Sequence, residues 1–353
     1  MVDSGGRSVE THAPGVSPRR SIPAPVPRSR RRVLITGASG MLGSDLAPVL
    51  AAAGYEVFPR SKAELDIADA AAVARELTAT RPDVLVNCAA FTKVDACETD
   101  PLAFAVNADA VGVLADACGH RSCQLVQIST DFVFDGAKHA PYVEDDPTRP
   151  LSAYGRSKRA GEEHALRLPG SLVLRASWLF GRAGWNFIEA ILKQVESGKT
   201  RLAVVADQVG RPTATTDLSE AILTLLDAGA MGVYHFANRG EVSWHDFASE
   251  ILALAGRGDV PIDAITSEKL ARPAPRPAYS TLDTGKYERL TGRAVRHFRD
   301  PLAEYIASRA RPEARGTIGI SDVGTGSTGD RRFSSERALD SGGPQEDDRC
   351  VSG

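Results

Sequence analysis

A short glycine-rich loop places the strongest constraint on how this chain can fold. Residues 37–43 have the sequence GASGMLG. They follow a β-rich apolar run at residues 33–36 and open an alanine- and leucine-rich segment, residues 41–53, that ends at Gly54. A strand, a loop with regularly spaced glycines and a helix in this order are typical of a dinucleotide-binding turn.

Each glycine has a separate physical role in such a turn. Gly37 permits the tight turn, Gly40 lets the backbone approach a pyrophosphate, and Gly43 lets the helix pack close to the sheet. The free N–H groups at the start of the helix would hold the phosphates. A glycine-rich turn without a ligand is the alternative. We expect the loop to bind a cofactor through Gly37, Ser39, Gly40, Met41, Leu42 and Gly43.

Strand and helix patterns alternate after this loop. We predict strands at residues 55–58 (stopped by Pro59), 83–88, 125–129 and 172–175, and helices at 70–80, 101–118 and 153–168. Such alternation predicts an α/β fold with a doubly wound parallel Rossmann sheet. The rhythm loosens after Phe180, which indicates a smaller, less regular C-terminal substrate lobe.

These patterns suggest boundaries within the 353 residues. Residues 32–180 are expected to form the dinucleotide-binding domain, whose core also draws on later segments, and residues 181–311 mainly the substrate lobe. Residues 1–31 and 312–353 are rich in Gly, Ser, Arg and Pro or Asp and have no periodic apolar pattern. We expect both to be disordered tails.

Composition narrows the classes of partner. The net charge of -3 gives no reason to expect nucleic acid. We find no apolar run that would cross a bilayer, so no membrane partner is expected. The five cysteines lack a Cys-x-x-Cys spacing, which favours reduced thiols in a cytoplasmic protein and argues against a metal site.

The loop and the second strand bear on the type of cofactor. The G-x-x-G-x-x-G spacing differs from the usual G-x-G-x-x-G and is typical of short-chain dehydrogenase/reductase proteins. The second strand ends in the sequence FPRS, without an acid to hold a ribose 2′-hydroxyl. Arg60 would instead neutralise a 2′-phosphate, so we expect NADPH, with NADH as the alternative. A solvated surface arginine is the simpler interpretation.

The candidate catalytic pair is Tyr154 and Lys158. Four residues apart on a helix, their side chains share one face. An ammonium beside a phenol lowers a pKa that begins near ~10, so that the tyrosine exchanges a proton near neutral pH. Thr130, in the upstream tripeptide STD at residues 129–131, adds a hydroxyl at the end of a predicted strand.

Five motifs occur in a fixed order: VNCAAFTKVD (86–95), ISTDFVFDG (128–136), YGRSK with AGE (154–162), RASWLFG (175–181) and DQVGRPT (207–213). Together they resemble the dTDP-4-dehydrorhamnose reductase family, over roughly residues 33–302. The resemblance implies reduction of the C4 ketone of dTDP-4-dehydro-L-rhamnose by NADPH, which yields dTDP-L-rhamnose. It adds a nucleotide-sugar substrate to the expected partners.

The resemblance also assigns residues to the site. It implies that Thr130, Tyr154 and Lys158 are catalytic, with Tyr154 as general acid and Lys158 also bonded to the nicotinamide ribose. Asp66 and Ile67 would contact adenine, and Ala89, Ala90 and Thr92 would line the path to the nicotinamide. The positions near the sugar and nucleotide of the substrate would be Val94, Asp131, Trp178 and Arg276, besides Thr130.

Some of these side chains have simpler structural interpretations. Thr130 would cap the next turn and Asp131 would form one, because both residue types do so commonly. Trp178 lies in an apolar run and would fill the core. These alternatives remain open on the sequence alone.

Rival functions share much of this pattern. A nucleotide-sugar dehydratase or epimerase would have the same fold, but dehydratases have Asp-Glu after the threonine, and Phe132 stands here in place of the glutamate. A further rival is a non-catalytic NADP-binding regulatory subunit similar to the methionine adenosyltransferase β subunit. Such a subunit retains the tyrosine and lysine, so the sequence leaves it open.

Some members of the family dimerise through a Mg²⁺ held by carboxylates. Asp45 would fill one ligand position, but Thr215 stands where another carboxylate is expected. We therefore do not expect a bound Mg²⁺. The sequence is compatible with a monomer or a homodimer.

Overall fold

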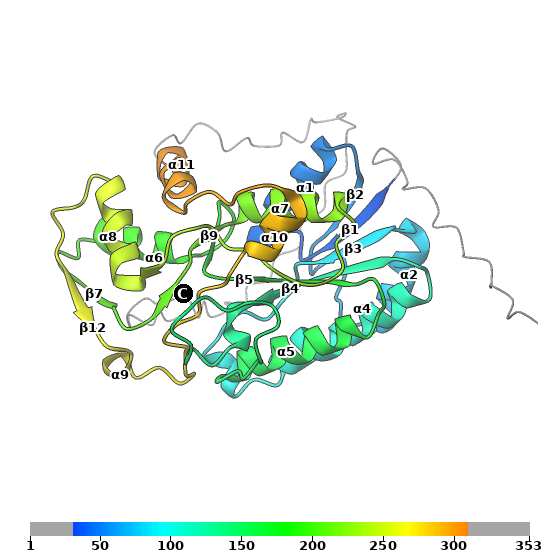
Figure 1. Ribbon diagram of the computed structural model, residues 1–353, viewed down its shortest axis with the longest axis horizontal. Coiled ribbons are helices and arrows are strands. Elements are labelled where there is room, and N and C mark those ends of the chain that lie inside the picture. Colours follow the sequence, from blue (N-terminus) through cyan, green and yellow to red (C-terminus); the bar gives the residue numbers. More distant parts are fainter. Residues whose placement is uncertain (1–30, 310–353) are drawn as a thin grey trace, which may run out of the picture.

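A parallel sheet forms the centre of the computed structural model, which describes residues 31–309 (Figure 1). Within these residues the sheet has six strands in the order β10-β5-β4-β3-β1-β2. The strands are β1 (Arg32–Thr36), β2 (Glu56–Arg60), β3 (Val84–Asn87), β4 (Gln124–Thr130), β5 (Leu172–Ala176) and β10 (Gly232–His235). The predicted doubly wound parallel fold is confirmed.

The strand order locates the binding crevice. From β1 the chain goes to β2 on one side and to β3 on the other, so the order reverses between β1 and β3. Ligands of such sheets bind outside the carboxyl ends of the strands at this switch point. The glycine loop follows β1 directly. The predicted cofactor loop therefore begins at the expected end of the sheet.

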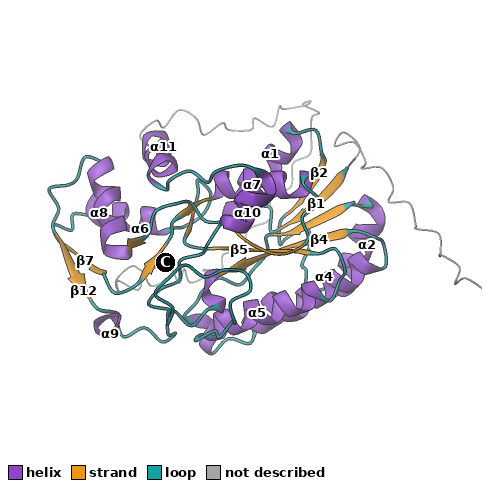
Figure 2. Ribbon diagram, in the orientation of Figure 1, coloured by secondary structure: helices purple, strands orange, loops and turns teal. Residues whose placement is uncertain are grey.

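Helices cover both faces of the sheet (Figure 2). Alternate residues of β1 point to opposite faces, with Val33 and Ile35 in one apolar core and Leu34 in the other. The first face packs against α1 (Met41–Ala52), α7 (Thr215–Asp227) and α10 (Gly285–Thr291). The second packs against α2 (Ala70–Thr80), α4 (Ala110–Gly119) and α5 (Ala153–Leu166).

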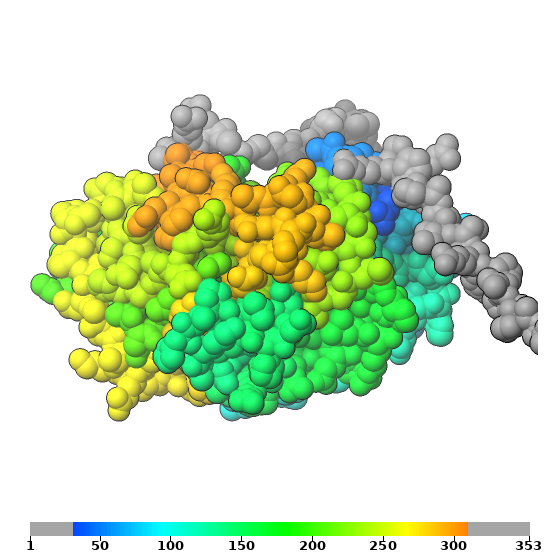
Figure 3. Space-filling view, in the orientation of Figure 1, coloured from blue at the N-terminus to red at the C-terminus, as the bar shows by residue number. Residues whose placement is uncertain are grey.

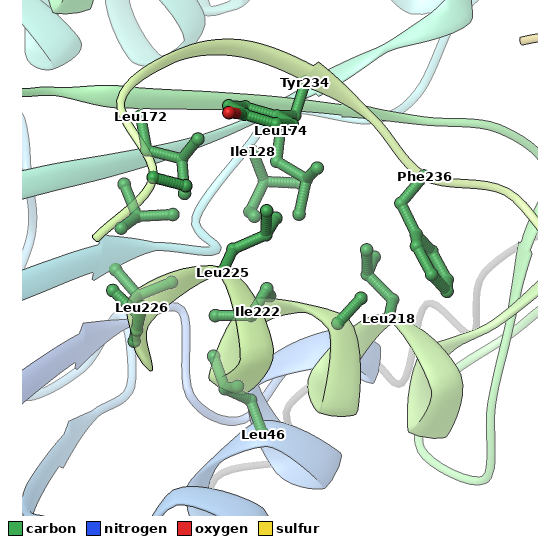
Figure 4. Packing of buried hydrophobic residues seen from close by; sticks show 14 of the residues in the cluster. Leu46, Ile128, Leu172, Leu174, Leu218, Ile222, Leu225, Leu226, Tyr234 and Phe236 are labelled. Carbon is green, nitrogen blue, oxygen red and sulfur yellow. The ribbon is translucent and has the colours of Figure 1, made fainter. Parts of the chain in front are cut away.

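Leucines of α7 fix this helix to the sheet. Figure 4 shows Leu218, Ile222 and Leu225 between Leu46 of α1 and the strand residues Ile128 and Leu174. Leu218, Ile222 and Leu225 are fully buried and lie at helical spacing. Helix α7 and strand β10 come from beyond residue 180, yet both pack into the six-stranded unit.

A second cluster of elements lies beside the carboxyl ends of the strands (Figure 1). Its apolar core is rich in aromatic rings, including Phe180, Phe187, Trp244 and Phe247. Its helices are α6 (Phe187–Glu196), α8 (Trp244–Leu254), α9 (Ser267–Leu270) and α11 (Arg299–Arg309). Short strand pairs join β7 (Leu202–Val205) to β12 (Ile262–Ile265), β6 (Leu179–Phe180) to β9 (Thr213–Ala214), and β8 (Val209–Gly210) to β11 (Val242–Ser243).

Late and early segments meet above the sheet. Figure 3 shows the orange segment near residue 285 lying against the teal segment near residue 140. The backbone N–H of Asp283 donates to the carbonyl of Tyr142 over 2.7 Å. Segments far apart in the chain are thus brought together beside the carboxyl end of β4.

One predicted boundary is wrong. Pro59 does not stop the second strand, because β2 continues through it to Arg60, with Pro59 opposite Ile35. Strand β2 is at the sheet edge, where a proline without an N–H group is tolerated. The helix expected over 101–118 is confirmed as an unbroken helical run, although it is divided into α3 (Leu102–Phe104), a π-helical stretch (Ala105–Asp109) and α4.

That divided helix also corrects an expectation about membranes. Among the described residues, Leu102–Gly119 is long and apolar enough to cross a bilayer by length and composition, although no such run was expected. In this structure 44% of the stretch is buried. Helix α4 packs between α2 and α5 as part of the second apolar core. The tails expected at 1–31 and 312–353 lie outside the described residues, except for Arg31.

Candidate active site

The glycine loop forms a cradle of bare backbone. Gly37 has φ +65°, and a Cβ there would lie 2.6 Å from the backbone nitrogen of Ala89, just after β3. A Cβ on Gly43 would lie 2.6 Å from the Cα of Ala38. Within the described residues, no side chain caps the start of α1 at Gly40. Its first N–H groups are therefore available to an anion, and the loop fits the pyrophosphate of a dinucleotide.

Arg60, Asp66 and Ile67 are the residues expected on the adenine side of the loop. The carbonyl of Arg60 accepts from Ala38 N–H over 2.9 Å, so Arg60 borders the loop. Its guanidinium, however, pairs with Glu76 of α2 at 2.8 Å. Asp66 is exposed and its carboxylate accepts from Ala68 N–H over 3.0 Å, whereas Ile67 is buried in the apolar core. The expected contact of Asp66 and Ile67 with adenine stays a prediction.

Helix α5 carries the candidate catalytic pair. The Ser152 hydroxyl caps the helix by accepting from Gly155 N–H over 3.2 Å. Tyr154 lies in the first turn and Lys158 one turn later, so the two share a face. The Lys158 ammonium is buried and donates to the carbonyl of Ile128, on β4, over 2.7 Å. Helix and strand together bring the pair to the carboxyl end of the sheet.

The electrostatics of the pair correct one expectation. Desolvation by the surrounding protein raises the pKa of Tyr154 above its ordinary value; the Thr130 hydroxyl opposes this and the Asp131 carboxylate adds to it. Burial lowers the pKa of Lys158 to about 8. The expected lowering of the tyrosine pKa is therefore wrong for this state. The phenol keeps its proton at neutral pH, as a general acid must.

Thr130 and Asp131 lie beside the tyrosine. The Thr130 hydroxyl donates to Asp131 Oδ1 over 3.0 Å and accepts from Phe132 N–H over 3.2 Å, which caps a 3-10 turn (Asp131–Val133). The predicted capping role is thus real. Burial raises the pKa of Asp131 to about 6, although the nearby Ser280 and Thr130 hydroxyls favour its ionised form. Within the described chain, its buried Oδ2 has no partner at ordinary hydrogen-bond distance.

The segment expected to line the nicotinamide path is held by a residue that the sequence did not single out. Ala89 and Ala90 are half-buried and Thr92 is exposed. The Asn107 amide accepts from Phe91 N–H over 2.8 Å and donates to Phe91 carbonyl over 3.0 Å and to Ser157 over 3.1 Å. Asn107 is buried within the π-helical stretch. An asparagine within the helical sequence AVNAD, residues 105–109, was the available signal.

The expected sugar side contains an aromatic stack. Trp178 has φ +46°, a conformation that is rare outside glycine, and its indole lies on that of Trp244 with ring centroids 3.5 Å apart. A Cβ on Gly210 would lie 2.4 Å from the same indole. Trp178 is only half-buried, so it packs against the core and also keeps an accessible part.

Val94 and Arg276 complete the predicted substrate residues. Val94 is half-buried in the loop after β3. Arg276 is only 5% exposed and pairs with Asp95 at 3.0 Å. Its guanidinium is therefore held by this chain's own carboxylate. Asp95 was not predicted, and its partner lies 181 residues away in the sequence.

The candidate metal position is closed by a hydrogen bond. The Thr215 hydroxyl donates to Asp45 Oδ2 over 2.5 Å, so the two residues meet as the sequence suggested. Between residues 31 and 309 no group of three His, Cys, Asp or Glu side chains is arranged to hold a metal ion. The donor set at Asp45 does not fit Mg²⁺, which prefers several oxygen ligands.

Comparisons with known proteins agree with this geometry. The model of the RmlD substrate binding domain matches residues 31–311. The dTDP-4-dehydrorhamnose reductase of Streptomyces griseus is 42% identical over 287 residues, 79% of this chain and 94% of that protein. The dTDP-4-keto-6-deoxy-D-glucose reductase of Streptomyces niveus is 37% identical over 276 residues, 77% and 96% of the two chains.

A solved structure is similar over the same region. The crystal structure of dTDP-4-dehydrorhamnose reductase from Bacillus anthracis, in complex with NADP, has a TM-score of 0.75 and 34% identity. The similarity covers 79% of this chain and 99% of that one. This chain therefore belongs to the dTDP-4-dehydrorhamnose reductase family.

Proposed function

We propose that this protein reduces the C4 ketone of dTDP-4-dehydro-L-rhamnose with NADPH and forms dTDP-L-rhamnose. The observation that carries the proposal is the position of a protonated Tyr154 beside Thr130 and one helical turn from Lys158, at the end of β4. The bare-backbone cradle after β1 supports a dinucleotide next to it. Relatives named for this reaction support the substrate class.

The residues of the chain have distinct tasks in this reaction. When bound, the reduced nicotinamide supplies a hydride to the carbonyl carbon. Tyr154 donates its phenolic proton to the carbonyl oxygen, on which negative charge develops. Thr130 donates a hydrogen bond to the same oxygen. The Lys158 ammonium stabilises the phenolate that remains and holds the nicotinamide ribose.

Phe132 favours reduction over elimination. Its ring meets the Tyr154 ring edge-on, with centroids 5.7 Å apart and an interplanar angle of 78°. A dehydratase would have a glutamate at this position to exchange a proton with the hexose. The apolar ring supplies no second carboxylate there, so the chemistry stops at transfer of hydride and one proton.

The cofactor preference and the location belong to the same proposal. Arg60 borders the loop, and exchange of its partner from Glu76 to a 2′-phosphate would favour NADPH over NADH. NADP in the Bacillus anthracis structure supports this choice. Four cysteines of the described region are free thiols, which agrees with a cytoplasmic enzyme.

A second candidate is reduction of another dTDP-keto-deoxy sugar. The Streptomyces niveus relative, named a dTDP-4-keto-6-deoxy-D-glucose reductase, favours it. The two candidates share Tyr154, Thr130 and Lys158 and differ only in how the sugar is held. A third, the non-catalytic regulatory subunit, requires a stoichiometric protein partner.

A substrate panel tests these candidates. Purified protein is mixed with NADPH and keto-deoxy sugars carried on dTDP, UDP or GDP, and the absorbance of the reduced cofactor is followed. We expect oxidation with dTDP-4-dehydro-L-rhamnose, and dTDP-L-rhamnose as the product by mass and NMR. Preferred turnover of another dTDP-hexulose would support the second candidate. Turnover of none, with co-purification of a partner, would support the regulatory subunit.

A further inference from the structure

A late segment of the chain forms one wall of the site. We call residues 272–283 the wall segment. The carbonyl of Ala278 accepts from Val209 N–H over 2.8 Å, and the carbonyl of Thr281 accepts from Tyr142 N–H over 2.8 Å. A Cβ on Gly136 would lie 2.6 Å from Pro277. The wall segment is therefore threaded between β8 and the loop that follows Asp131.

The wall segment reaches the candidate catalytic residues. Ser280 lies close enough to the Asp131 carboxyl to favour its ionised form and lower its pKa against the effect of burial, although no hydrogen bond of ordinary length joins the two among the described residues. The same carboxylate accepts a hydrogen bond from the Thr130 hydroxyl over 3.0 Å. A shift of the wall segment would consequently alter the orientation of Thr130.

One carboxylate anchors the start of the wall segment. Asp95 accepts two hydrogen bonds from Arg276, over 3.0 and 3.2 Å, and one from Arg272 over 2.9 Å. It also accepts from Ala274 N–H over 3.2 Å. Burial alone would raise the pKa of Asp95, but the bonds from Arg276 and Arg272 lower it to about 2. The Asp95 carboxylate is therefore charged at neutral pH and can hold both arginines.

The same turn also anchors the catalytic helix. Asp95 precedes a 3-10 turn, Ala96–Glu98. Glu98 Oε1 accepts from Ala153 N–H, at the start of α5, over 2.7 Å. Cys97, 3% exposed, packs with Ala153 against Tyr154. A single turn after β3 thus holds the wall segment on one side and the helix of Tyr154 on the other.

We propose that Asp95 is a positioning residue, which locks the wall segment onto the cofactor-binding half so that Thr130 and Tyr154 are aligned before the sugar binds. Arg276 then acts through Asp95 and does not itself contact the substrate. This inference rests on the proposed reduction of a nucleotide sugar, and it names which contact organises that site.

The test compares Asp95→Asn with a matched variant, Asp263→Asn. Asp263 also pairs with an arginine, Arg201 at 2.6 Å, but both are exposed on the second cluster of elements. We expect Asp95→Asn to raise KM for the sugar substrate roughly tenfold or more, as the loss of charge-assisted hydrogen bonds implies. The Kd for NADPH should stay within about twofold, because no binding group of the loop is removed. Asp263→Asn should change neither.

A double variant separates positioning from simple loss of a buried charge pair. Asp95→Asn leaves the buried Arg276 without its partner and threatens folding. In Asp95→Asn/Arg276→Gln both charges are gone. We expect the double variant to fold and to keep the raised KM, with Arg276→Gln alone giving the same rise. Two outcomes would overturn the proposal. One is recovery of the wild-type KM in the double variant, and the other is a rise in its KM equal to the product of the rises in the two single variants.

Hydrogen exchange supplies a readout that does not need turnover. Peptides covering residues 272–283 should exchange faster in Asp95→Asn than in the wild type, with little change in Asp263→Asn. If this holds while no sugar is turned over by the wild type, the anchor exists and the proposed function is wrong. If hydrogen exchange of residues 272–283 is unchanged in Asp95→Asn, then Asp95 does not hold the wall segment, whatever the substrate is.

Discussion

Glu162 and Arg175 form a two-point ion pair that is almost fully buried between helix α5 and strand β5. Their nitrogen–oxygen distances are 2.8 and 2.7 Å, and the side chains are only 3% and 5% exposed. Arg175 Nη1 also lies 3.2 Å from His235 Nε2. Burial, and then the charge of Arg175, lower the pKa of His235 to about 3, so this histidine stays neutral. The pair fixes the helix of Tyr154 and Lys158 to the sheet.

We predict that Glu162→Gln destabilises the protein by about 3–5 kcal/mol, the usual cost of breaking a buried ion pair. The reason is that Arg175 would keep its charge without a carboxylate in a buried site. Urea denaturation at neutral pH measures the free energy of unfolding. Glu163→Gln is the matched control: its pair with Arg159, at 3.0 Å, is exposed and should matter little. Equal losses in the two variants would contradict the prediction.

Activity should decline on the alkaline side near pH 8. Lys158 acts as an ammonium, and burial lowers its pKa to about 8, so the active form is present below that pH and lost above it. The raised pKa of Tyr154 keeps the phenol protonated over the same range. Measurement of kcat/KM over roughly pH 6 to 10, a range that includes this pKa, tests the predicted alkaline decline in activity.

The control for that measurement is Lys158→Arg. Arginine keeps its charge throughout the range, so its residual activity should lack the decline near pH 8. An identical decline in this variant would assign it to another group.

Arg60→Gln should weaken NADPH binding about tenfold and leave NADH binding nearly unchanged, because a charged hydrogen bond to the 2′-phosphate is lost. Titration of both cofactors by fluorescence gives the two Kd values. Arg75→Gln removes the same charge from an exposed position on α2 and serves as the control. A parallel loss of NADH affinity would show that Arg60 supports the loop and does not select the cofactor.

The features that could be predicted from the sequence are those determined by residues close together in the chain. A run of apolar residues, a glycine loop and an apolar helix predicted β1, the cradle and α1, because each obeys a short-range rule. The helical spacing of Tyr154 and Lys158 likewise predicted their shared face. Thr130 had two interpretations, a turn cap and a catalytic hydroxyl. The structure shows that it caps the turn and also lies beside Tyr154.

Long-range partners were beyond such rules. Nothing local connects Asp95 to Arg276 or indicates that Arg60 faces Glu76, because charged side chains choose partners only after the chain has folded. The pKa of Tyr154 was predicted in the wrong direction for the same reason. The spacing of the lysine was visible in the sequence, whereas the desolvation that raises the pKa of Tyr154 depends on the packed surroundings.

The role of Tyr154 as proton donor is tested most directly by kcat for Tyr154→Phe with dTDP-4-dehydro-L-rhamnose and NADPH. Removal of the proton donor should lower kcat by about 100- to 10,000-fold, the usual contribution of general acid catalysis. The Kd for NADPH should change little. The control is Tyr55→Phe, which should keep the wild-type kcat. The Tyr55 hydroxyl lies away from the site and donates a hydrogen bond to Asp227 over 3.0 Å. A Tyr154→Phe enzyme with wild-type kcat would contradict the account, because the proton would then come from another group.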